Sequence, residues 1–66
     1  MKLGKPLRHK ELKYLIVTPV TKRVLHDELQ PRTKDIVFYL CDVSNGSETH
    51  QEHYTEKYLK NDFQTL

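Results

Sequence analysis

The sequence predicts a small, mainly β protein that forms a single domain over residues 1–66. Two runs rich in β-branched and aromatic residues, 12–17 and 35–43, have the composition of strands. Residues 44–47 contain the Asn-Gly pair that is typical of a hairpin turn. A chain of 66 residues can build only one modest core, and its stability is expected to be marginal.

The N-terminal part divides into a basic segment and a strand. Residues 1–11 are basic and contain Gly4 and Pro6, so we expect an irregular lead-in. Residues 12–17 follow as Leu-Lys-Tyr-Leu-Ile-Val, and only one charge interrupts this run. The pattern predicts a strand with apolar side chains on both faces.

The next segment fits two structures. Thr18 could cap a helix that has Pro19 at its first position, which gives an α+β fold with a helix near residues 19–29. The same residues could instead form the outgoing arm of a long hairpin, and the many Thr and Val residues favour this strand. Residues 30–34 contain Pro31 and no apolar side chain, so they are predicted to form an exposed loop.

Residues 35–43 give the clearest element. Apolar side chains occupy both alternating sets of positions, which predicts a central strand that is either covered on both faces or curled into a barrel. After the Asn-Gly turn, the polar residues 48–54 are expected to return as an edge strand. The two apolar sets are Val37, Tyr39, Cys41 and Val43, and Ile36, Phe38 and Leu40.

The C-terminus has the signature of a helix start. Thr55 can cap the helix, Glu56 suits its first turn, and Tyr54 can pack onto Leu59. At roughly ten residues, the helix must dock on the sheet to be stable. Together the elements predict a strongly curled sheet that closes its own edges, an SH3-like barrel with a short C-terminal helical turn. The expected buried side of the helix consists of Tyr58, Leu59, Phe63 and Leu66.

The order of these segments resembles small uncharacterised bacterial and phage domains with an SH3-like barrel. The resemblance covers about two-thirds of the chain and leaves out the residues between Val17 and Asp35. It implies the barrel fold and a phage or mobile-element setting, and it implies no catalytic residue. The segments that carry it are Arg8-His9, Tyr14-Leu15-Ile16-Val17, Ile36-Val37-Phe38-Tyr39, Gly46 and residues 55–63.

Charge is distributed unevenly along the chain. Residues 1–34 contain nine Lys and Arg against three Asp and Glu, a net charge of +6, and residues 35–66 contain two against six, a net charge of −4. This asymmetry indicates either a nucleic-acid or membrane partner or two halves that complement each other in the fold. Tyr14 or Tyr39, if exposed, could stack on a base. The candidate nucleic-acid contacts are Lys5, Arg8, Lys10, Lys13, Lys22, Arg23, Arg32 and Lys34.

Few residues suggest catalytic or metal chemistry. His50 and His53 have a ligand-like spacing, but side chains three apart in a strand point to opposite faces. Cys41 lies in the most apolar run and is expected to be buried. The sequence His26-Asp27-Glu28 is expected to be an exposed acidic loop, and two glycines are too few for a phosphate-binding loop. We therefore predict no catalytic, cofactor-binding or metal-binding residue and no enzyme activity.

These patterns predict a non-enzymatic binding module. The expected partner is a protein, and the resemblance implies a phage- or prophage-encoded modulator of a host protein. The alternative is nucleic-acid binding through the basic N-terminal half. No signal peptide is visible, and the longest apolar run, residues 36–41, is too short to span a bilayer, so we expect a cytoplasmic protein with no membrane partner. The oligomeric state is not predicted.

Overall fold

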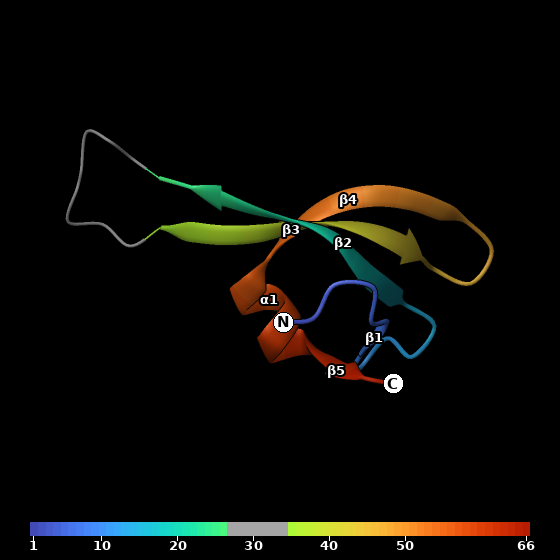
Figure 1. The fold of residues 1–66 in the computed structure, drawn as a ribbon. Helices are drawn as coiled ribbons and strands as arrows, with labels where there is room; N and C mark the ends of the chain where they lie inside the picture. Colours follow the sequence, from blue (N-terminus) through green and yellow to red (C-terminus); the bar gives the residue numbers. More distant parts are fainter. Residues whose placement is uncertain (27–34) are drawn as a thin grey trace.

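The fold is mainly β, as predicted: one antiparallel sheet of five strands and one short helix (Figure 1). The computed structural model describes residues 1–26 and 35–66. The strands lie in the order β4-β3-β2-β1-β5, and within the described residues no pairing joins β4 to β5, so the sheet is not closed. The elements are β1 (Leu7–His9), β2 (Ile16–Leu25), β3 (Ile36–Ser44), β4 (Thr49–Thr55), α1 (Glu56–Asp62) and β5 (Phe63–Thr65).

The long hairpin of β2 and β3 crosses the whole molecule (Figure 1). Its register shifts between Pro19, opposite Cys41, and Thr21, opposite Leu40, so that Val20 is the extra residue of a β-bulge. Proline cannot donate a hydrogen bond to a neighbouring strand, and a bulge is one of the few places in a sheet that accept it. The alternative of a helix is therefore wrong for residues 19–26, and residues 27–29 lie outside the described residues together with the whole of the predicted loop 30–34.

The turn between β3 and β4 is the predicted Asn-Gly turn. The Asn45 amide donates to the Glu48 carbonyl at 3.1 Å, and the Glu48 amide donates to Asn45 Oδ1 at 3.2 Å. Gly46 has a φ of 100°, a conformation that side-chain-bearing residues rarely adopt. The return strand β4 is polar and lies at the edge of the sheet, which confirms the predicted edge strand.

The C-terminal helix begins where the sequence predicts and ends sooner. Thr55 is the N-cap, and its hydroxyl accepts a hydrogen bond from the Tyr58 amide at 3.2 Å. The helix stops at Asp62 because Phe63 is extended and starts β5, which pairs with β1. Phe63 is buried, as predicted, but from a strand, whereas Leu66 is 61% exposed and does not join the core.

Removing the cap of α1 tests this assignment. Thr55→Ala leaves the Tyr58 amide without its acceptor, which typically costs about 1 kcal/mol. In a domain of this size, that loss lowers the melting temperature by roughly 4–8 °C. Thr55→Ser keeps the hydroxyl and is the matched control, which should melt close to the parent. Equal melting temperatures for Thr55→Ala and the parent in a thermal scan would contradict the cap.

The structure corrects the N-terminal part of the prediction. Leu7–His9 form strand β1 within the segment expected to be irregular, and β2 starts at Ile16 rather than at Leu12. The turn between these strands is held by His9, whose Nδ1 accepts from the amides of Glu11 at 3.1 Å and Leu12 at 3.0 Å. These hydrogen bonds to the His9 side chain thus hold a turn in the segment where the apolar composition favoured a strand.

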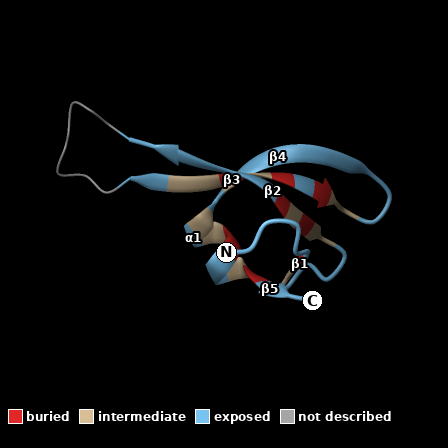
Figure 2. Cartoon of the chain, in the orientation of Figure 1, coloured by how far each residue is buried: buried red, intermediate tan, exposed pale blue. Residues whose placement is uncertain are grey.

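The core lies on one face of the sheet, where α1 and the N-terminal segment cover it (Figure 2). The prediction that β3 is covered on both faces is wrong. On the opposite face Phe38 and Leu40 are only half-buried, and Ile36 is 51% exposed. Val20 is also exposed, because the bulge turns it out of the core face. The buried residues of the core are Leu7, Val17, Tyr39, Cys41, Val43, Leu59 and Phe63.

A polar contact ties the helix to the central strand. The Tyr39 hydroxyl donates to Glu56 Oε2 at 2.9 Å, and Lys60 Nζ lies 3.0 Å from Glu56 Oε1. The hydrogen bond from Lys60 and then that from Tyr39 lower the pKa of the Glu56 carboxyl. Burial, followed by the bond to Glu56, raises the pKa of Tyr39. Both groups therefore stay in the protonation states that keep the contact at neutral pH.

Candidate functional site

The clearest concave site lies between the N-terminal segment, α1 and β5. We call it the basic groove, with a volume of about 530 Å³. Its floor consists of Leu7, Leu59 and Phe63, which are all buried members of the core. Its rim carries Lys2 and Lys5. Lys60 is the third rim lysine, and it stands on α1.

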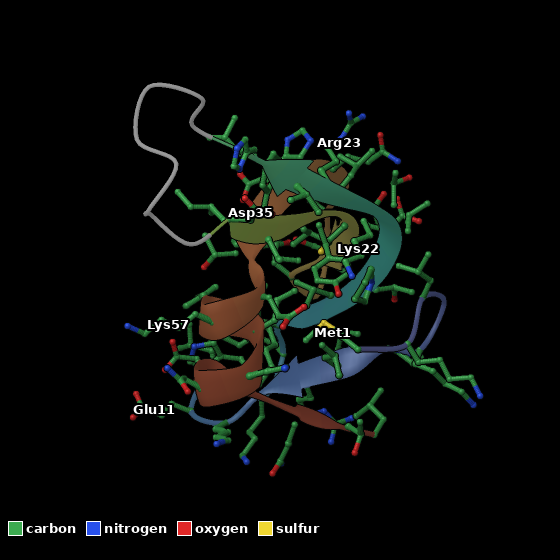
Figure 3. All side chains as sticks on the ribbon, turned by 60° about the vertical axis from the view of Figure 1, so that its left-hand side comes forward. Met1, Glu11, Lys22, Arg23, Asp35 and Lys57 are labelled. Carbon is green, nitrogen blue, oxygen red and sulfur yellow. The ribbon has the colours of Figure 1, made fainter. Side chains whose placement is uncertain are left out.

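The N-terminal segment forms one wall of the groove because it folds back onto the sheet. Gly4 has a φ of 79°, which allows the chain to reverse, and its amide donates to the Pro19 carbonyl at 2.8 Å. This bond fastens the segment to β2 beside the bulge. Figure 3 shows Met1 between β2 and β1, beside α1. The exposed Met1 thus lines the groove beside the buried residues of its floor.

Positive charge dominates the rim. Within residues 1–26 and 35–66, no Asp or Glu lies within the ion-pair distance of 4.0 Å from Lys2 or Lys5. Lys60 pairs with Glu56, but that carboxylate also accepts the Tyr39 hydroxyl. The groove therefore combines an apolar floor with a cationic rim, an arrangement suited to an anionic ligand that has an apolar part.

The predicted nucleic-acid contacts are dispersed over the structure. Lys5 lines the basic groove, while Lys10 Nζ donates to the Asn61 carbonyl at 3.0 Å. Lys22 pairs with Tyr39 and its neighbour Arg23 with Phe38, so their side chains leave opposite faces of the sheet.

The other predicted contacts lie elsewhere. Lys13 is in the turn before β2, and Arg8 is in β1 with its Nε buried and unpaired in the part of the chain described. Arg32 and Lys34 lie outside the described residues. The six described candidates therefore do not form one basic face.

Few ion pairs join the two oppositely charged halves. Across the described ranges, the His26–Asp35 pair is the only ion pair that joins residues 1–34 to residues 35–66. Glu56 pairs with Lys60 and Glu52 with His50, all within the acidic half. Pairing between the halves therefore does not neutralise the lysines and arginines of residues 1–26.

The other polar residues singled out in the sequence are not assembled into a reactive site. His50 lies opposite Val43 and His53 opposite Leu40, so the two imidazoles face opposite sides of β4. No group of three metal-ligating side chains occurs in residues 1–26 or 35–66. Cys41 is fully buried as predicted, and burial, with the charge of Asp42, raises the pKa of its thiol to about 11.

A second hollow lies on the other face of the sheet, between the ends of β2, β3 and β4. Its volume is about 380 Å³ and its lining includes Asp42 and Gln51. Gln51 Nε2 donates to Asp42 Oδ1 at 2.9 Å, so these two side chains already satisfy each other. The buried Val43 also lines this hollow, but no lysine does.

Sequence reasoning identified only part of the basic groove. It placed Leu59 and Phe63 in the core and counted Lys2 and Lys5 among basic residues. It missed Leu7, a single apolar residue in a polar segment, and it missed Lys60, which stands in the acidic half. Leu7 and Lys60 come to the same groove because β5 pairs with β1, and no local sequence pattern indicates this pairing.

Comparison with known proteins finds no matching family model, no similar curated protein and no similar solved structure. None of the described helices is long and apolar enough to cross a membrane. The function proposed below therefore rests on the residues and geometry of the chain itself.

Proposed function

We propose that this chain is a non-enzymatic binding module whose partner is a protein held in the basic groove. The observation that carries the proposal is the groove itself, which is lined by two exposed apolar residues, Met1 and Leu66, together with the buried core residues Leu7, Leu59 and Phe63. An apolar side chain of a partner that fills such a site gains about 1.5–3 kcal/mol by leaving water. Anchors of this kind dominate the binding energy of many protein interfaces.

We also propose that the sheet belongs to the SH3-like barrels. The support is its connectivity, in which β1 to β4 are neighbours in order and α1 carries the chain to the far edge, where β5 pairs with β1. Pairing of the first and last strands is how small barrels bring their two ends together. The phage or mobile-element setting rests on the sequence resemblance and stays a prediction.

Blocking the groove tests the protein-binding proposal. Thr65 lines the groove and is exposed, so a Thr65→Trp side chain should fill it with little effect on β5. The parent should retain a protein from a host lysate after crosslinking, and Thr65→Trp should lose it. Thr21→Trp, which changes an exposed threonine of β2 outside the groove, is the matched control.

A nucleic-acid ligand is the second candidate, and it is favoured by the lysines and arginines of residues 1–26, which no ion pair among the described residues joins to the acidic half. The same capture experiment separates the two. Retained DNA or RNA whose binding falls steeply with salt, and which Thr65→Trp leaves unchanged, would replace the protein-binding proposal with this one. A retained protein that survives the Thr65→Trp change would also contradict the groove as the site.

A further inference from the structure

The chemistry of the rim and floor narrows the kind of partner. Building on the protein-binding function above, we propose that the basic groove receives an acidic segment of the partner that carries one bulky apolar side chain. The apolar side chain enters the groove over Leu7, Leu59 and Phe63, and carboxylates on either side of it meet the lysines.

The lysines stand on two different walls. Lys2 and Lys5 belong to the N-terminal segment, while Lys60 belongs to α1. Positive charge therefore borders the floor from two directions rather than from one end. A ligand with acidic groups on both sides of its apolar anchor complements this arrangement, and such complementarity fixes orientation and speeds association.

The rim is also available to a ligand. Within the described residues Lys2 and Lys5 have no carboxylate partner, so a ligand need not displace an existing ion pair at that wall. At the other wall Glu56 shares its charge between Lys60 and the Tyr39 hydroxyl. Glu56 itself does not line the groove, so its carboxylate is not one of the groups that a ligand in the groove meets.

The floor distinguishes a peptide from other anions. Phe63 is 3% exposed, so its ring cannot offer the open face on which a nucleic-acid base stacks. Leu7 and Leu59 are as deeply buried, and the exposed apolar residues that line the groove are Met1 and Leu66. An apolar side chain from an extended segment can pack against these two residues above the buried floor while its backbone stays at the rim.

Peptide binding measured by fluorescence anisotropy tests the inference. The probe is a short labelled peptide with one leucine or phenylalanine between aspartates and glutamates. It should bind the parent with an affinity that weakens as salt is added. Two matched peptides, one with glycine in place of the anchor and one with asparagine and glutamine in place of the acids, should each bind at least about tenfold more weakly.

Charge-matched variants locate the site. Lys2→Glu with Lys5→Glu should weaken binding of the acidic peptide by about tenfold or more. Lys13→Glu with Lys57→Glu changes the total charge equally, at positions outside the groove, and should stay within about twofold of the parent. Figure 3 shows Lys57 on α1, pointing away from Met1. Circular dichroism before each titration establishes that both double variants are folded.

Several results would overturn the inference. Equal weakening in the two double variants would show that overall charge rather than the groove attracts the peptide. Equal binding of the glycine peptide would exclude the apolar anchor, and groove-dependent binding of anionic vesicles or single-stranded RNA in place of the peptide would assign a different ligand. If no peptide binds while Thr65→Trp still abolishes capture of a partner, the acidic-segment inference fails and the protein-binding proposal stands.

Discussion

A Leu59→Ala variant is expected to be largely unfolded at 25 °C. Leu59 is 1% exposed and belongs to the core cluster, in which it is the only buried residue of α1. Truncation of a buried leucine typically costs about 2–5 kcal/mol, because the transfer energy is lost and a cavity is left. A domain of this size has a net stability of about 3–5 kcal/mol. The loss is therefore comparable with the whole stability of the fold.

Thermal unfolding followed by circular dichroism measures this effect. Leu12→Ala removes the same atoms from a residue that is 43% exposed, so it is the matched control and should melt near the parent. If Leu59→Ala melted within a few degrees of Leu12→Ala, α1 would not be docked on the sheet as described. The floor of the basic groove would then be assigned to the wrong residues.

The second large effect is expected from Tyr39→Phe. This change keeps the buried ring and removes the hydroxyl that donates to Glu56. Hydrogen bonds to charged groups contribute about 1.5–3 kcal/mol. The lower end is expected here, because the side chain of Glu56 is 26% exposed. Tyr14→Phe, at a residue that is 58% exposed, is the matched control in a urea titration.

The same variant changes how stability depends on pH. The pKa of Glu56 lies below its ordinary value of 4.5 in the folded protein, so the unfolded chain binds more protons in acid. The stabilisation is therefore complete above about pH 4.5 and is lost as the pH falls through the lowered pKa. Without the Tyr39 hydroxyl the pKa of Glu56 rises toward 4.5, and acid should cost the variant less stability than the parent. Parallel acid profiles for the two proteins would contradict this contact.

The sequence predicted correctly those elements whose geometry depends on residues close together in the chain. Asn45-Gly46 predicted the hairpin because few other residues accept a positive φ, and Thr55 predicted the helix start because its hydroxyl can accept an amide hydrogen bond. The strand at residues 35–43 followed from its alternation. The turn, the helix start and the strand each depend on residues within a few positions of one another, and a single sequence shows these residues directly.

Features that depend on distant pairing could not be predicted in this way. Both faces of β3 are apolar in sequence, and the pattern does not show that α1 covers the side of Tyr39 while Phe38 is only partly buried. A truncation at Phe38 is accordingly expected to cost less than one at Tyr39. The same limit applies to the basic groove, since Leu7 and Phe63 come together only when the two ends of the chain pair.

The reactivity of the single cysteine can report how often the core of the unmodified chain opens. The Cys41 side chain is fully buried in the central strand, between Pro19 of β2 and Glu52 of β4, and its thiol has a raised pKa of about 11. The thiolate is the nucleophile that attacks a thiol-modifying reagent, so a buried thiol with a raised pKa is not modified while the core is closed. The rate of labelling therefore measures how often the sheet opens around β3. Ligand occupancy of the groove can thus be followed as slower labelling, with no added probe on the protein.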